Sequence, residues 1–135
     1  MKHLFKPSLL LLLLPLMAAC TTAKPQITLE APEEGAQCAI GNDIHFVAML
    51  SDSRGLKTYS IQIAPKEGGT VSSGTVPFHY HQTWELFNEK ETHLHHHQII
   101  IPPNAAPGTH LFTIVCTNKS GKKSTTAVPI EVVLP

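Results

Sequence analysis

Histidine is concentrated in two short stretches of this 135-residue chain. Six of the nine histidines lie between residues 79 and 97, in "HYH" and in "HLHHH". Neutral imidazole is a good ligand for Zn(II), Cu(II) or Ni(II), whereas calcium and magnesium prefer oxygen ligands. The residue types therefore point first to a transition-metal site.

The spacing of the two stretches predicts two consecutive antiparallel strands, joined through "QTWELFNEKET" by a turn near Asn88. Side chains alternate along a strand, and directly opposed residues share a face. Centring the turn on Asn88, or shifting it by one residue, changes which histidines are opposed but not the face they share. The candidate metal ligands on that face are His79, His81, His93, His95 and His97, with His96 on the other side.

Two other interpretations of the cluster stay open. Grouped imidazoles repel one another once they are protonated, which would make the face sensitive to pH near 6. Alternatively, the histidines are simply the polar outer face of a strand. Three glutamates in or beside the turn could complete a metal shell: Glu85, Glu89 and Glu91.

The histidine strand continues into three isoleucines, and this creates a conflict of faces. His93, His95 and His97 have the same parity as Ile99 and Ile101, which are expected in the core. Because unpaired polar groups inside a core are costly, we expect either a β-bulge near Gln98 that switches the parity or an open end of the sandwich.

The first residues have the pattern of an export signal. A basic start and an apolar run from Leu9 to Met17 are followed by small residues that end at Cys20. The close resembles the lipobox of bacterial lipoproteins. That resemblance implies a signal peptide over 1–19, a lipid on Cys20, a tether over 20–26 and anchoring to the outer membrane.

Two further cysteines, Cys38 and Cys116, form a candidate disulfide in an exported chain. In a sandwich they would fall near opposite ends, which argues against the bond. The ten basic and ten acidic residues balance, which argues against nucleic acid or an anionic surface as partner.

Residues 27–135 show short alternating runs separated by Pro, Gly, Asn and Asp. This pattern predicts an all-β domain of about seven strands, an antiparallel sandwich of immunoglobulin type. One inward face should carry Ile44, Phe46, Ala48 and Leu50, and another His110, Phe112, Ile114 and Cys116.

Two segments carry a family resemblance, "GNDIHFVAMLSDSRGLKTYSIQI" and "IIIPPNAAPGTHLFTIVCTNKSGKKS". They resemble the Ig-like or cadherin-like domains of exported lipoproteins. With its two histidine-rich strands, the chain is similar to an uncharacterised Bacteroidetes lipoprotein family, the domain of unknown function numbered 4625. His110 stands where such domains usually have a corner Tyr, and Asn118 where Asp is usual, which weakens any expectation of calcium binding.

These observations predict a non-catalytic lipoprotein of the cell envelope whose Ig-like module binds a Zn, Cu or Ni ion. The alternative is a protein- or glycan-interaction module without metal, in which Tyr80, Trp84 and Phe87 supply contact area and an envelope protein is the partner. Neither a nucleophile–base pair nor a carboxylate dyad stands out, so we do not expect an enzyme.

Overall fold

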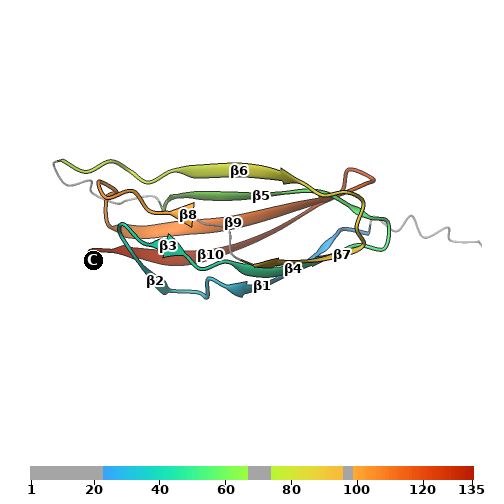
Figure 1. Cartoon of the computed structure of the whole chain (residues 1–135), viewed down its shortest axis with the longest axis horizontal. Helices are drawn as coiled ribbons and strands as arrows, with labels where there is room; N and C mark the ends of the chain where they lie inside the picture. Colours follow the sequence, from blue (N-terminus) through green and yellow to red (C-terminus); the bar gives the residue numbers. More distant parts are fainter. Residues whose placement is uncertain (1–22, 67–73, 96–98) are drawn as a thin grey trace, which may run out of the picture.

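Ten β-strands and no helix make up the part of the chain that the computed structural model describes, residues 23–66, 74–95 and 99–135. The strands are β1 (Gln26–Ala31), β2 (Ala36–Ala39), β3 (Asp43–Ile44), β4 (Val47–Ser51), β5 (Leu56–Pro65), β6 (Tyr80–Glu85), β7 (Glu91–His95), β8 (Ile99–Ile100), β9 (Gly108–Asn118) and β10 (Lys123–Val133). They run along the long axis of the molecule (Figure 1). All seven predicted strands are present, two of them interrupted, and β2 is additional.

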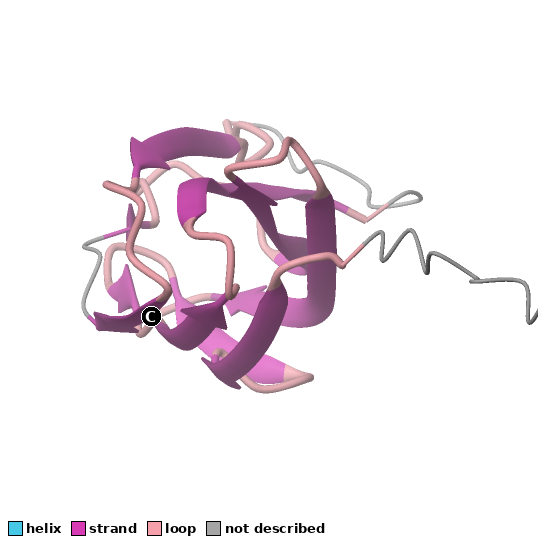
Figure 2. Ribbon diagram, turned by 90° about the vertical axis from the view of Figure 1, so that its right-hand side faces the viewer, coloured by secondary structure: helices cyan, strands magenta, loops and turns pink. Residues whose placement is uncertain are grey.

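The strands form two main sheets that enclose the core (Figure 2). One sheet has the order β1-β4-β7, the other β2-β10-β9-β5-β6, and β3 pairs with β8. Every pairing is antiparallel except that of β2 with β10. The chain crosses directly between the two main sheets from β1 to β2, from β4 to β5 and from β6 to β7. It also passes through the β3–β8 pair on the way from β2 to β4 and from β7 to β9. This connectivity is that of an Ig-like sandwich.

The core confirms the predicted inward faces. Alternate residues are buried from Ile44 to Leu50, and the same holds in β5 and β9. The rings of Phe46 and Phe112 lie 5.8 Å apart and join the two sheets at the centre. Apolar alternation on both inner faces therefore decides which way each strand faces.

His110 lies near the start of β9, at the position where the resemblance led us to compare it with a corner Tyr. Its imidazole is buried, and Nδ1 donates to the carbonyl oxygen of Gly108 at 2.8 Å. The ring lies 5.9 Å from that of Phe78, and Nε2 has no hydrogen-bond partner among the described residues. His110 thus makes a local corner bond with one ring nitrogen and is packed among apolar groups with the other.

The predicted hairpin between the two histidine-rich strands is wrong. β6 pairs with β5 in the five-stranded sheet, whereas β7 pairs with β4 in the three-stranded sheet. The connection over 86–90 crosses from one sheet to the other. Asn88 does have the positive φ, 63°, that a turn residue needs, but its N–H donates to Leu56 at the start of β5.

Trp84 helps to hold β6 in the five-stranded sheet, away from β7. Its indole stacks on Tyr59 of β5, with ring centroids 4.8 Å apart and planes 13° from parallel. Stacked aromatic cross-strand pairs stabilise their pairing by about 0.5–1 kcal/mol. The loop backbone adds bonds to β5, from Leu86 N–H to Lys57 at 2.7 Å and from Leu56 N–H to Glu89 at 2.8 Å. A side-chain stack and a hydrogen-bonded loop hold β6 against β5.

Candidate metal-binding face

The sheet arrangement separates the histidines that were expected to converge. His79 and His81 are exposed at the start of β6, on the edge of the five-stranded sheet. His93 and His95 are exposed on β7, in the three-stranded sheet. The candidate ligands of β6 therefore do not share a face with those of β7. His97, the fifth predicted ligand, and His96 lie outside the described residues.

Within the described ranges, no group of three or more His, Cys, Asp or Glu side chains is placed to hold one metal ion. This finding applies to the histidines of both sheets. An ion bound here would therefore have at most two of the described His, Cys, Asp or Glu side chains as ligands.

One pair of imidazoles does meet, and the sequence did not predict it. The rings of His45 and His95 have centroids 5.6 Å apart and planes 79° apart. Both residues are exposed on the outer side of the three-stranded sheet. The register explains the contact, because Val47 lies opposite His95 and His45 is two residues further along the same face.

The contact between His45 and His95 depends on how β4 pairs with β7, and not on a run of histidines in the sequence. His45 stands alone in "DIHFVAML", where it looks like an ordinary polar residue on an outer face. Its partner belongs to a strand some fifty positions later. Only the pairing of β4 with β7 brings the two together, and local spacing does not encode that pairing.

The face continues along β7 to an ion pair. His93 Nε2 lies 3.2 Å from Glu91 Oε1, and both side chains are largely exposed. A contact of this kind contributes little to stability, because solvent screens it and both side chains lose rotamer freedom. Met49 lies directly opposite His93 on β4. The outer face of β4 and β7 thus carries three imidazoles, one thioether and one carboxylate.

The expected change of parity before the isoleucines is confirmed. Leu94 is buried, and so is Ile99 five residues later, so the inward parity changes between them. The strand registers show the same change. Val47 pairs with His95 and Ile44 pairs with Ile99, so three residues on one side are matched by four on the other. A one-residue shift of this type lets the histidines face solvent while the isoleucines face the core.

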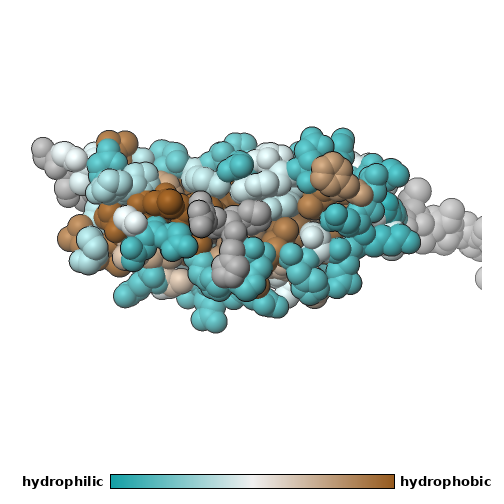
Figure 3. Space-filling model, viewed as in Figure 1, coloured by the Kyte–Doolittle hydropathy of each residue, from teal (hydrophilic) through white to brown (hydrophobic). Residues whose placement is uncertain are grey.

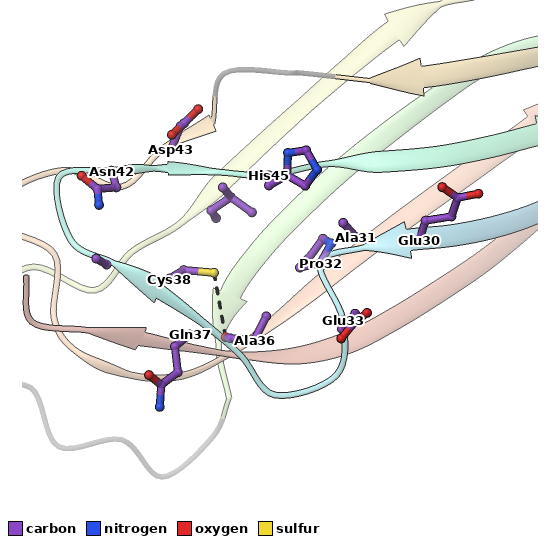
Figure 4. Close-up of a pocket in the computed structure, with 12 residues that line it drawn as sticks. Glu30, Ala31, Pro32, Glu33, Ala36, Gln37, Cys38, Asn42, Asp43 and His45 are labelled. Atoms are coloured by element: carbon purple, nitrogen blue, oxygen red, sulfur yellow. Dashed lines mark hydrogen bonds between the residues drawn. The ribbon is translucent and has the colours of Figure 1, made fainter.

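His45 is one of the residues that line an open groove of ≈ 500 Å³. Figure 4 shows residues that line it, which come from the end of β1, from β2 and from β3. The Cys38 thiol donates to the carbonyl oxygen of Ala36 at 3.9 Å, and partial burial raises its pKa. At neutral pH this thiol stays protonated, so it is a poor metal ligand.

The candidate disulfide between Cys38 and Cys116 is not formed, and both thiols are free. Cys38 pairs with Val132 of β10, and Cys116 pairs with Ser124 of the same strand. Eight residues of strand separate these partners, which is about 26 Å, and a disulfide needs Cα atoms within about 7 Å. The argument from the ends of the sandwich therefore predicted the outcome.

The aromatic residues of the alternative interaction surface divide into two groups. Trp84 and Tyr80 are half-buried and pack against the core, and the Tyr80 hydroxyl bonds to Gln82 at 2.8 Å. Phe87, in the crossing loop, is 81% exposed. Of the three, Phe87 alone presents most of its ring to solvent.

No helix able to cross a membrane occurs in the ranges that the structure describes.

Comparison with known proteins gives a family and a set of distant folds. The model of the family described as domain of unknown function DUF4625 matches residues 18–133, so the chain belongs to this family. No protein with a curated description matches. Among solved structures, the fibronectin(III)-like modules of Clostridium thermocellum CbhA are 14% identical with a TM-score of 0.48, over 82% of this chain and 47% of that one.

Two other solved structures are similar at the same level. CopC from Methylosinus trichosporium OB3b is 15% identical with a TM-score of 0.40, over 79% of this chain and 93% of that chain. The β-glucosidase from Listeria innocua in complex with glucose is 11% identical with a TM-score of 0.41, over 83% of this chain but only 16% of the enzyme. The chain thus spans less than half of the CbhA and β-glucosidase chains.

Proposed function

We propose that this member of the DUF4625 family is an exported, lipid-anchored and non-catalytic module that binds a transition-metal ion through His45 and His95. The observation that carries the proposal is the contact of these two exposed imidazoles across β4 and β7. The export pattern and Cys20 at the N-terminus support the anchor.

The distance between the two rings fits one shared ion. A nitrogen ligand lies about 2.0–2.1 Å from zinc or a similar ion, which puts the ion roughly 3 Å from the ring centroid. Two imidazoles on one ion therefore have centroids roughly 5–6 Å apart, and His45 and His95 are 5.6 Å apart. Small rotations of the exposed rings can aim both nitrogens at the ion.

Chemistry then favours particular ions. Imidazole binds Cu(II) more tightly than Ni(II) or Zn(II) at a given site, so copper should bind best. With two protein ligands and water in the other positions, the site would exchange its ion readily. Such a site suits capture and transfer of a metal better than permanent storage.

The deciding experiment is calorimetric titration of the mature chain with Cu(II) and Ni(II) at pH 7. We expect His45→Gln/His95→Gln to lose at least tenfold in affinity. The matched control is His79→Gln/His81→Gln, which removes as many histidines from the opposite sheet and should bind like wild type. If the two variants lose affinity equally, the assignment of the site is wrong.

Protons compete for the same ring nitrogens, so bound metal should be released as the pH falls from 7 towards 5. Repeating the titration at pH 5 tests this. Binding that is equal at both pH values would indicate that histidine is not the ligand.

A second candidate function, a protein- or glycan-binding module, is favoured by the position of β6. This strand ends the order of the five-stranded sheet, so one of its edges has no neighbouring strand among the described residues. Exposed edges can accept a strand from a partner. Substitution of exposed Thr83 by Pro would remove a backbone donor there, and the loss of a captured partner with metal binding intact would favour this function.

A further inference from the structure

The chain has no net charge, but its basic and acidic residues are concentrated at different ends of the long axis. Four segments meet at the end where the described chain begins, and together they are called the tether pole: residues 23–26, 51–57, 85–91 and 117–123. This pole holds seven of the eight Lys and Arg residues in the described ranges, namely Lys24, Arg54, Lys57, Lys90, Lys119, Lys122 and Lys123.

Acidic groups partly offset these cations. The tether pole has four carboxylates, Asp52, Glu85, Glu89 and Glu91, which leave it with a net charge of +3 when histidine is neutral. Asp52 is buried and accepts from the Asn118 amide, so the three glutamates are the carboxylates exposed at this pole. The other described residues have five carboxylates and a single cation, Lys66.

The N-terminal segment is fastened to this same pole. The side chain of Asn118 donates to the carbonyl oxygen of Ala23 at 3.1 Å, and Arg54 Nη1 donates to the same oxygen at 3.4 Å. The Ser124 hydroxyl donates to the carbonyl oxygen of Pro25. Cys20, the expected site of the lipid, is three residues before Ala23, which is at most about 10 Å of chain.

Hydrogen bonds also join the loops of the pole to one another. Lys119 N–H donates to Gly55 at 2.9 Å, and Asp52 N–H donates to Lys90 at 2.8 Å. Gly55 has a φ of 102°, and a Cβ there would lie 3.1 Å from the carbonyl oxygen of Asn88, so the two loops approach closely. The pole is therefore a preformed surface, not a set of separate loops.

An exposed aromatic residue completes the surface. Phe87 is 81% exposed and lies between the crossing strands β6 and β7, within the tether pole. Hydrophilic side chains cover the rest of this end in the view of Figure 3, on the right. One exposed apolar ring among cations is the pattern of a surface that rests on lipid headgroups and inserts one side chain.

The basic and acidic ends of the molecule are far enough apart for a charged surface to interact with only one of them. An eleven-residue strand such as β9 spans about 36 Å. At physiological ionic strength the electrostatic potential decays over about 8 Å. A charged surface that touches the tether pole is therefore screened from the acidic remainder of the molecule.

We propose that the tether pole docks on a bilayer surface with anionic headgroups and holds the sandwich upright on the membrane. Charge complementarity and the point where the chain leaves toward Cys20 select this partner. The balanced net charge argued against an anionic surface as partner, but net charge does not describe this local separation. Docking in this orientation keeps the outer face with His45 and His95 parallel to the membrane normal and open to solvent.

The test is co-sedimentation of the unlipidated chain that starts at Thr21 with vesicles of phosphatidylethanolamine and phosphatidylglycerol. All ten strands and the described core lie within residues 26–133, so this chain keeps the fold. Two variants lower the net charge equally, Lys119→Gln/Lys122→Gln at the tether pole and Lys66→Glu away from it. Both lysines of the first variant bond to the neighbouring residues through backbone atoms, so their substitution keeps these hydrogen bonds.

Each cation near an anionic surface changes partitioning about fivefold, so the double variant should bind about 25-fold more weakly. Lys66→Glu should stay within about twofold of wild type, and neutral phosphatidylcholine vesicles should not bind. Phe87→Ser should lose about fivefold at low and high salt alike, because burial of the ring does not depend on charge.

Equal losses for the two charge variants, or equal binding to neutral vesicles, would overturn the proposal. Retained binding to soluble heparin without any binding to vesicles would overturn it as well, because it would assign the pole to a soluble polyanion. None of these measurements depends on metal at His45 and His95, so the two proposals fail separately.

Discussion

Two buried polar residues lie near opposite ends of β9, at the two positions where the sequence was compared with the Ig-like pattern that it resembles. Asn118 closes β9 at the tether pole, and His110 opens β9 at the other end. Asn118 has no exposed surface, and every polar atom of its side chain is paired. His110 is also buried, but one of its two ring nitrogens is paired and the other has no partner among the residues that the structure describes.

The Asn118 amide makes bonds in four directions. Nδ2 donates to Asp52 Oδ2 at 3.0 Å and to Ala23, while Oδ1 accepts from the N–H groups of Ser120 and Lys122 at 3.0 and 2.9 Å. Asp here would face the Asp52 carboxylate across the same short distance, and the pair would need a cation. The amide donates to Asp52 where a second carboxylate would repel it, so no cation is needed between the two side chains.

The comparison teaches that burial alone does not show how much a polar residue contributes to stability. A fully paired buried group belongs to a network whose members all lose when it is removed. A buried group with one unpaired atom has lost that atom's hydrogen bond to water without gaining one in the protein, and this already lowers the stability of the folded state. The two departures should therefore differ greatly in the effect of an apolar substitution.

The largest effect is expected for Asn118→Leu. This change leaves buried Asp52 without its amide donor and frees two N–H groups of the β9–β10 turn. Hydrogen bonds to charged groups contribute about 1.5–3 kcal/mol and neutral ones about 1 kcal/mol, so we expect a loss of about 3–5 kcal/mol in the free energy of unfolding. Denaturant unfolding measures it, with Lys119→Ala as a control that should change little. If the free energy of unfolding falls by less than about 1 kcal/mol, Asn118 contributes no more to stability than we expect of His110.

Next in size is an alkaline loss of stability at Cys116, which lies in β9 close to the Asn118 network. Burial, and then the negative charge of Asp52, raises the pKa of this thiol from 9.0 to about 11. The unfolded chain loses the proton first, so stability is complete below pH 9 and falls between pH 9 and 11. A shift of this size corresponds to about 2–3 kcal/mol at pH 11.

Denaturant unfolding from pH 8 to 11 checks this prediction. Cys116→Ala should cost about 1 kcal/mol at pH 8 through the small cavity that it leaves, and it should flatten the decline. Burial and then Tyr80 also raise the pKa of Tyr59 above its ordinary value of 10.0, so Tyr59 adds to the decline above about pH 10. The contribution of Cys116 is therefore measured between pH 9 and 10. If the decline is as steep without Cys116 as with it, the thiol does not report on the network.

Much of the fold could be predicted from the sequence because it depends on alternation within each strand. The inward faces around Phe46 and Phe112, and the change of parity before Ile99, follow from which side chains must avoid water. β2 was missed because "AQCA" is short and weakly apolar, and its place depends on pairing with distant β10.

The candidate site could not be predicted because it depends on which strands become neighbours. "QTWELFNEKET" has the length and the Asn of a hairpin, yet the Tyr59–Trp84 stack holds β6 on the other sheet. An Ig-like fold accepts its fourth strand on either sheet, and one choice joins the histidine stretches while the other separates them. The contact of His45 with His95 follows from the second choice.

The smallest effect is expected for His110→Phe. The change removes the bond to Gly108, worth about 1 kcal/mol, and also removes the buried Nε2 whose desolvation is not compensated, which costs about as much. The ring next to Phe78 is replaced by one of similar shape. We therefore expect unfolding free energy within about 1 kcal/mol of wild type, in contrast with Asn118→Leu. A loss above about 2 kcal/mol would show that Nε2 is bonded in solution, for example to a buried water, and that both ends of β9 rest on fully paired polar groups.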